Sequence, residues 1–248
     1  MIAPPPAFAG GGDNRSSVAE SGDDGDGTRG DRPPRGSPEA LAASSTAVEF
    51  SHSRIILTML NLGGLEMLAT ASMDCMISLW DLQTGKHKRS LEGHSKGVCC
   101  LSYSPEYRFL VSGGFDFDVI VWNPYVEHLI LRLPGHTNSI CGVEIVADSP
   151  QLVTADVDGV IRVWDGDSVL LRRMTGGHDA DITALCFSHN LSLIATGGSN
   201  GTVVIWDFEF GRLLGKCDKI ISAITNLAFV DPYPALLSSD GSGTFHLW

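Results

Sequence analysis

The chain has 248 residues, 43% of them hydrophobic, with 17 Lys and Arg against 29 Asp and Glu, for a net charge of -12. This size and hydrophobic content allow one large globular domain or two small ones. Nucleic-acid binding needs clustered cations, so the acidic balance argues against a nucleic acid as the main partner.

Neither a membrane segment nor a secretory signal is recognisable. The longest nearly apolar stretch, residues 55–62, is far shorter than the ~20 residues that a membrane span needs. The first residues, MIAPPPAFAGGGDNR, lack a basic n-region, and prolines interrupt their apolar part. We therefore expect an intracellular protein, located in the cytoplasm, with no membrane partner.

Residues 1–47 differ in composition from the rest. They hold half of the twelve prolines and eight glycines, and they show no periodic apolar positions. Such a segment cannot bury enough apolar surface to offset its ordering entropy, so we predict a disordered tail. Its Asp-Asp-Gly-Asp-Gly run lacks the closing Glu and the flanking helices of a calcium loop.

From residue 48 to residue 248 the sequence is a repeat. The tryptophans recur every 42 residues, and other residues keep the same phase, so internal repetition is the first fact about the fold. We divide the region into units at 52–91, 94–133, 136–175, 178–217 and 220–248. The five tryptophans, one at the same place in each unit, are Trp80, Trp122, Trp164, Trp206 and Trp248.

Each unit holds at least three short extended segments. They are rich in Val and Ile, alternate in polarity and are separated by turn residues, which is typical of strands rather than helices. In residues 157–164 and 199–206, Asp-Gly and Asn-Gly stand between two such segments, as in a two-residue hairpin turn. A more polar fourth segment follows four of the tryptophans, as in residues 85–94, and its lysines are typical of an outer strand.

A unit of about 42 residues with Gly-His near one end and Trp-Asp at the other resembles the WD-repeat (beta-transducin-like) family. The resemblance covers about residues 50–248 and rests on several copies in phase, such as Gly93-His94 with Trp80-Asp81. It implies an all-β fold, a β-propeller of four-stranded blades. Departures from the pattern are Ser51-His52, Trp122-Asn123 and Lys219-Ile220, and the fifth unit is the least orthodox.

The resemblance also assigns a role to the recurring His, Ser or Thr, Asp and Trp. In the family these four residues form a hydrogen-bonded network inside each blade, which is a structural role for a set that otherwise suggests a hydrolytic triad. In the fifth unit Ile220 and Ser242 replace two members, so we expect the weakest network there. The expected networks comprise His52, Thr70, Asp74, Trp80; His94, Ser112, Asp116, Trp122; His136, Thr154, Asp158, Trp164; His178, Thr196, Asn200, Trp206; and Ser238, Trp248.

The other candidate motifs for catalysis or metal binding have better structural explanations. Residues 197–201, GGSNG, match a nucleophile elbow, but a strand follows where the elbow needs a helix. The six cysteines show no CxxC and are expected to be buried free thiols. The histidines are spread one per unit and should not converge on a metal. We expect no catalytic residue, no cofactor and no metal.

Residues 170–174, LLRRM, resemble the phosphoinositide-binding Phe-Arg-Arg-Gly motif of one propeller subfamily. They lack both the Phe and the Gly, and arginines at an outer strand can be solvated. The alternative functions therefore are a propeller that binds a small ligand or a phosphoinositide, or an enzymatic domain.

The expected function is a non-catalytic protein-protein interaction scaffold, a WD-repeat platform within a larger complex. In the family, the residue before the turn Asp lies near the entrance of the central channel, and the first three units hold apolar residues there. The expected partner surface, unless these side chains pack against the next blade, is Met73, Phe115, Phe117 and Val157.

Two further resemblances concern the kind of complex. Propellers that recruit cullin-type ubiquitin ligases carry Arg or Lys two places after the Trp-Asp Asp. Gln83, Tyr125, Asp167 and Glu209 stand there in this chain, which disfavours that adaptor role. Residues 121–136 are similar to a blade of long, double-propeller WD-repeat proteins that also carry EF-hands.

The last residues, 239–248, read as the turn and third strand of a fifth blade. In one interpretation, residues 46–50 supply the fourth strand and close a five-bladed ring. In the other, which we favour, the sequence is a fragment of a longer propeller, commonly seven-bladed in this family, and the isolated chain should expose a sheet edge.

Overall fold

The computed structural model describes residues 51–126, 128–147, 149–230 and 232–248. The chain divides into two compact units, Met1–Ser45 and Thr46–Trp248, and every described residue lies in the second unit. The tail predicted for residues 1–47 lies outside the described residues.

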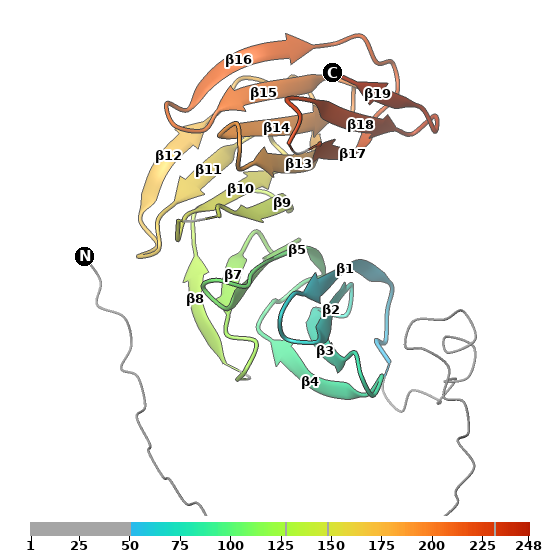
Figure 1. Ribbon diagram of the computed structural model, residues 1–248, viewed down its shortest axis with the longest axis vertical. Helices are drawn as coiled ribbons and strands as arrows, with labels where there is room; N and C mark the ends of the chain where they lie inside the picture. Colours follow the sequence, from blue (N-terminus) through green and yellow to red (C-terminus); the bar gives the residue numbers. More distant parts are fainter. Residues whose placement is uncertain (1–50, 127, 148, 231) are drawn as a thin grey trace, which may run out of the picture. The chain divides into compact units, whose positions relative to one another are not determined.

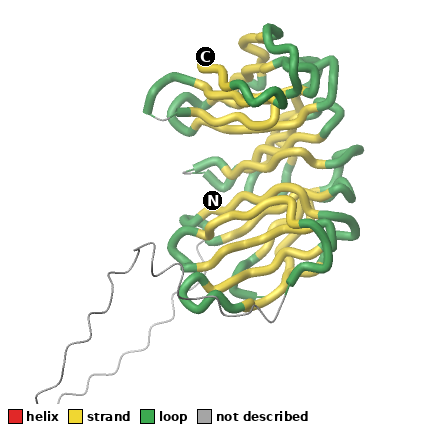
Figure 2. The backbone as a smooth tube through the Cα atoms, turned by 90° about the vertical axis from the view of Figure 1, so that its right-hand side faces the viewer, coloured by secondary structure: helices red, strands yellow, loops and turns green. Residues whose placement is uncertain are grey.

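Within the described ranges the chain forms strands and loops but no helix (Figure 2). This confirms the all-β expectation. The strands form five antiparallel sheets that follow one another in chain order (Figure 1). The first four sheets have four strands each, and the described part of the fifth has three, in line with the repeated blades that the 42-residue period predicted.

The first two sheets illustrate the common order, in which each strand pairs with the next along the chain. The strands of the first sheet are β1 (Ile56–Leu62), β2 (Met67–Ser72), β3 (Met76–Asp81) and β4 (His87–Glu92). Those of the second sheet are β5 (Val98–Ser104), β6 (Phe109–Gly114), β7 (Val119–Trp122) and β8 (Leu129–Leu133).

The remaining sheets repeat this order. The strands of the third sheet are β9 (Ile140–Ile145), β10 (Leu152–Asp156), β11 (Ile161–Trp164) and β12 (Leu170–Met174). Those of the fourth are β13 (Ile182–Ser188), β14 (Leu193–Gly198), β15 (Val203–Asp207) and β16 (Arg212–Cys217). Those of the fifth are β17 (Ile224–Phe229), β18 (Leu236–Asp240) and β19 (Phe245–Leu247).

The hydrophobic core lies between neighbouring sheets. The first strands of successive sheets, β1, β5, β9, β13 and β17, pack against one another in that order. One buried cluster joins Leu62 and Ile77 of the first sheet to Leu110 and Trp122 of the second, and three similar clusters join the later neighbours. Each sheet therefore buries its apolar residues against the sheets beside it, as expected for a repeat architecture.

Hydrogen bonds also link neighbouring sheets. The thiol of Cys99 on β5 donates to the carbonyl oxygen of Ile140 on β9 at 2.8 Å. Two periods later, the hydroxyl of Thr183 on β13 donates to the carbonyl oxygen of Ile224 on β17 at 2.6 Å. A side chain at this phase therefore connects two sheets, a role that the phased apolar positions of the sequence did not indicate.

The turn between the second and third strands differs from the two-residue hairpin turn that Asp-Gly and Asn-Gly predicted. In the third sheet the Asp156 N–H donates to the Val160 carbonyl at 3.1 Å, which leaves three residues in the loop. Only the third of these has a positive φ, whereas a two-residue type I′ turn needs two. This left-handed position, with φ between 73° and 88°, recurs as Cys75, Phe117, Gly159, Gly201 and Gly243.

Candidate interaction site

In each of the first four sheets, a buried hydroxyl on the second strand lies between a histidine and a tryptophan. The hydroxyl oxygen is 2.7 to 2.8 Å from the histidine Nε2 and accepts the indole N–H at 2.8 to 2.9 Å. These groups are His52, Thr70 and Trp80; His94, Ser112 and Trp122; His136, Thr154 and Trp164; and His178, Thr196 and Trp206.

A carboxylate completes the group in the first two sheets. The Nδ1–H of His94 donates to Asp116 at 2.9 Å, which leaves Nε2 to accept from the hydroxyl. His52 and Asp74 make the same contact at 2.9 Å. Burial alone would raise the pKa of Asp116, but the hydrogen bond and the charge of His94, with two backbone N–H groups, hold that pKa at about 2.

In the third sheet the predicted carboxylate is wrong. His136 Nδ1 lies 2.7 Å from Asp156, whereas the predicted Asp158 is exposed and accepts from the side-chain amide of Asn138. Asp156 ends β10 two residues after Thr154, so both side chains point to the face of the sheet on which His136 lies. Asp158 belongs to the turn. Burial lowers the pKa of His136, and Asp156 opposes that shift.

In the fourth sheet the corresponding residue is an amide, and it does not bond to the histidine. Asn200 Oδ1 accepts from the Thr202 N–H at 3.2 Å, and among the described residues the buried Nδ1 of His178 has no hydrogen-bond partner. Burial, with the charge of Lys216, lowers the pKa of His178 to about 4. This imidazole is therefore neutral near pH 7.

The fifth sheet keeps only part of the network. Ser238 accepts from the Trp248 indole at 3.0 Å, and Ile220 stands where the other units have His. Asp240, at the phase of Asp156 two periods earlier, accepts from the hydroxyl and N–H of Ser242, and this holds its pKa at about 2. The recurrence of Asp at this phase is the sequence signal that would have revealed both carboxylates.

The network is inaccessible to a substrate. Ser112, which with His94 and Asp116 has the residue types of a hydrolytic triad, is 0% exposed and already accepts the indole N–H of Trp122. The arrangement orders the interior of each sheet, because every buried donor needs an acceptor. In the ranges that the structure describes, no three His, Cys, Asp or Glu side chains could hold a metal ion.

The glycine of Gly-His has a packing reason. A β-carbon on Gly93 would come within 2.7 Å of the Trp122 ring, so the tryptophan of one sheet lies on the chain that leaves the sheet before it. The same contact recurs between Gly177 and Trp206. The glycine before each of these histidines therefore leaves room for the tryptophan of the same unit.

Three of the cysteines, Cys100, Cys141 and Cys186, are poorly suited to redox chemistry. The six cysteines, all in the described part of the chain, are free thiols. Burial raises the pKa of Cys186 to about 12 and raises the pKa of Cys141 further. A hydrogen bond with Cys99, together with burial, raises the pKa of Cys100 as well. These thiols stay protonated and unreactive at neutral pH.

The predicted partner surface lies on the turns of the first three sheets. Met73 and Phe115 are half-buried and lie against the same residue, since a β-carbon on Gly97 would be 2.8 Å from Met73 Sδ and 3.2 Å from the Phe115 ring. Phe117 has a φ of 73°, and the ammonium of Lys96 lies 5.1 Å from the centroid of its ring. Val157 is half-buried and has the same position in the third sheet as Phe115 has in the second.

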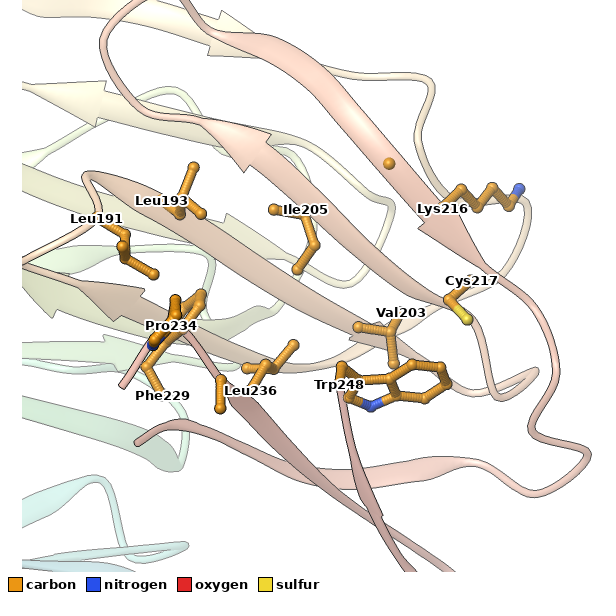
Figure 3. A pocket seen from close by; sticks show the side chains of 12 residues that line it. Leu191, Leu193, Val203, Ile205, Lys216, Cys217, Phe229, Pro234, Leu236 and Trp248 are labelled. Carbon is orange, nitrogen blue, oxygen red and sulfur yellow. The ribbon is translucent and has the colours of Figure 1, made fainter. Parts of the chain in front are cut away.

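A separate apolar cavity of about 300 Å³ lies between the fourth and fifth sheets. Figure 3 shows Val203 and Ile205 of β15 on one side and Leu236 and Trp248 on the other. Lys216 is the one ionisable group among its lining residues besides Cys217. The cavity has the lining of a packing gap or an apolar pocket and lacks converging polar groups for chemistry.

Comparisons with known proteins agree with this repeated geometry. The family profile described as "WD domain, G-beta repeat" matches residues 85–123, 127–165 and 169–207. These three segments of the chain are thus WD repeats, as the phased Gly-His and Trp-Asp pairs predicted. None of the described residues forms a helix long and apolar enough to cross a membrane.

Curated relatives match only parts of the chain. Over 84 residues, 34% of this chain, it is 37% identical to cilia- and flagella-associated protein 337 B of Tetrahymena thermophila, of which 7% is covered. It is 42% identical to human DDB1- and CUL4-associated factor 10 over 64 residues, 25% of this chain and 11% of that protein. It is 29% identical to mouse coronin-7 over 100 residues, 40% of this chain and 11% of that protein. The chain therefore spans about a tenth of the length of these relatives.

Proposed function

We propose that this chain is a non-catalytic scaffold that holds another protein through the turns of its first three sheets. WD repeats generally mediate contacts between proteins, and the buried His, Ser and Asp groups are occupied by the interior of each sheet. What remains for function is the surface of loops that the rigid sheets present.

The backbone conformation of Phe117 is the observation that most supports the turns as the binding surface. A bulky aromatic residue with a φ of 73° is strained, while glycine occupies the same phase in the third, fourth and fifth sheets. Strain of this kind is found where a side chain is needed for binding. Phe117 lies in the same turn as Phe115, and Phe115 and Met73 both lie against Gly97, so apolar residues occupy the turns of two neighbouring sheets.

The test is affinity purification of the full chain followed by quantitative mass spectrometry, with Phe115→Asp and Phe117→Gly as variants. We expect partner recovery to fall at least about tenfold for Phe115→Asp, because a charge would enter an apolar contact. Ser199→Asp, at the phase of Phe115 on the fourth sheet, is the matched control and should leave recovery unchanged. Unchanged recovery with a folded Phe115→Asp protein would refute the proposal.

Phe117→Gly separates binding from stability. Replacing a left-handed phenylalanine with glycine should raise the midpoint of thermal unfolding, since about 1 kcal/mol of strain is relieved. Partner recovery should fall in the same variant. A loss of both stability and recovery would instead mean that Phe117 serves the fold.

The relatives named as DDB1- and CUL4-associated supply a second candidate, an adaptor of that kind. The 42% identity to the human protein favours it, whereas the absence of Arg or Lys two places after the Trp-Asp Asp disfavours it. Co-purification of the chain with DDB1 would decide for the adaptor.

We place the scaffold inside the cell, in the cytoplasm, as its expected location.

A further inference from the structure

The outer strands of the first four sheets share a feature that their sequences do not reveal. In β8, Leu129 pairs with Trp122 and Leu131 with Val121, so Ile130 lies between them without a partner on β7. Such a β-bulge turns an additional side chain outward. The bulge residues of the four outer strands are Lys88, Ile130, Leu171 and Leu214.

In the second, third and fourth sheets this bulge residue and the residue before it are exposed and apolar. The first sheet has His87 and Lys88 at these positions instead. We call the six apolar residues the rim surface. They are Leu129 (38% exposed), Ile130 (53%), Leu170 (39%), Leu171 (42%), Leu213 (45%) and Leu214 (56%).

The rim surface extends over three neighbouring sheets. In Figure 1, β8, β12 and β16 follow one another along the outer side of the sheets. Leu131 of β8 packs into the cluster that contains Trp164 of the third sheet. Arg172 of β12 lies 5.7 Å from the ring centroid of Phe208, in the turn before β16. The middle residue of one outer strand therefore contacts the next sheet.

Cations border the rim surface on one side. Two residues after each apolar bulge stands Arg132, Arg173 or Lys216. Arg132 pairs with Asp118 at 2.6 Å and Lys216 with Asp179 at 2.7 Å, while Arg173 forms no ion pair within the described ranges. β8, β12 and β16 contain no Asp or Glu, although the chain has a net charge of -12.

Acids border the other side. Asp167 and Glu209 lie in the exposed turns before β12 and β16, on the opposite side of the leucine pairs from Arg173 and Lys216. On this same side Arg212 precedes Leu213 and offsets part of the charge of Glu209. A ligand that covers the rim surface would therefore meet more positive charge along the edge of Arg132, Arg173 and Lys216 than along the other edge. This asymmetry defines how such a ligand must be oriented.

We propose that the rim surface binds an amphipathic helix of a partner protein. The apolar stripe of the helix would lie across the leucine pairs of three sheets, and its acidic edge would face Arg132, Arg173 and Lys216. Proteins usually protect outer strands with charges, as β4 does with Lys88 and Arg89, so exposed leucines at the same positions in three consecutive sheets indicate an interface. The bulges disfavour the addition of an extended strand, whereas a helix presents its apolar residues as one stripe.

The probe is a labelled synthetic helix of 18 residues, with leucines at i, i+3, i+4 and i+7, glutamates along one edge and glutamines along the other. A second peptide has lysine in place of every glutamate. Fluorescence anisotropy with the full chain should show the glutamate peptide binding at least about tenfold more tightly than the lysine peptide. The triple variant Ile130→Ser, Leu171→Ser, Leu214→Ser should lose at least about tenfold in affinity.

Three further variants are measured in the same assay, two as controls and one as a test of the charged edge. Lys88→Ser changes the bulge of the first sheet and should leave the affinity within about twofold of the wild type. Arg173→Gln should lower the affinity for the glutamate peptide and should make that affinity depend less on salt concentration. The Phe115→Asp variant changes a turn residue outside the rim surface and should bind the peptide with wild-type affinity. This proposal and the proposed function can therefore fail separately.

Equal affinities for the two peptides, or a folded triple variant that binds like the wild type, would overturn the proposal. Vesicles of phosphatidylcholine with phosphatidylserine test the other anionic, apolar ligand. Binding of the wild type to these vesicles, lost in the triple variant and without binding of the glutamate peptide, would assign the surface to a membrane and would also overturn it.

Discussion

At the scale of single residues, one hydroxyl in each of the first four sheets holds two partners. Ser112→Ala would leave the indole N–H of Trp122 and Nε2 of His94 buried without a partner, and each unpaired group costs about 1–3 kcal/mol. We expect a loss of about 2–4 kcal/mol in the free energy of unfolding, measured in urea. Ser238→Ala is the control and should cost about 1 kcal/mol or less, since it frees only Trp248, which is 37% exposed. Equal losses would contradict this account.

Glu144 on β9 predicts how stability depends on pH. Burial raises the pKa of Glu144 to about 7 from an ordinary 4.5, and a hydrogen bond with Ser102 opposes that shift. The folded state therefore retains this proton where the unfolded state has lost it, so stability falls as the pH rises from about 4.5 to about 7. Relative to the wild type, Glu144→Gln should gain up to about 3 kcal/mol at pH 7 and little below pH 4.5. A gain that does not change with pH, or the same effect from the exposed Glu106→Gln, would contradict it.

At the scale of the elements, the turns between the second and third strands are alike but differ in their surroundings. A β-carbon on Gly201 would overlap the carbonyl oxygen of Ile220, whereas around Gly243, with nearly the same φ, it would meet nothing within 4 Å. Gly243→Ala should cost about 1 kcal/mol through backbone strain alone. Gly201→Ala should cost about 3 kcal/mol or more, because backbone must move as well. The midpoint temperatures of thermal unfolding of the two variants measure the difference. Similar midpoints would show that the backbone at Ile220 moves aside at little cost.

The strands themselves were predictable from local pattern. Alternation, Val and Ile content and turn residues indicated three segments in each unit and a more polar outer one in the first four units, and the described sheets have these strands in this order. The bulges were not predictable, since Ile130, Leu171 and Leu214 look like ordinary strand residues. Their exposure depends on how the outer strand pairs beside the tryptophan.

At the scale of the whole described unit, the sheets depend on their neighbours. Each apolar cluster joins two sheets, and Trp122 and Trp206 lie against Gly93 and Gly177, in the segments that connect their sheets to the sheets before them. At the two ends of the series the apolar residues are more exposed, as at Ile55 (73%) and Phe245 (71%). Whether these surfaces belong to a longer propeller or to a ring of five stays a prediction.

The 42-residue period and the local pattern indicated five units and the strands within each, because the same pattern recurs in one phase. The Gly-His and Trp-Asp pairs added the resemblance to the WD-repeat family. The family resemblance indicated the hydroxyls and indoles, and the structure places them within hydrogen-bonding distance, as in Ser112 with Trp122 and Thr154 with Trp164. Only the tertiary structure decided that Asp156 rather than Asp158 reaches His136 and that Asn200 leaves His178 without a carboxylate. The structure alone also showed that the outer leucines of three sheets are exposed. These outcomes depend on where a strand ends and on what the adjacent sheet covers, and residues far apart in the sequence set both.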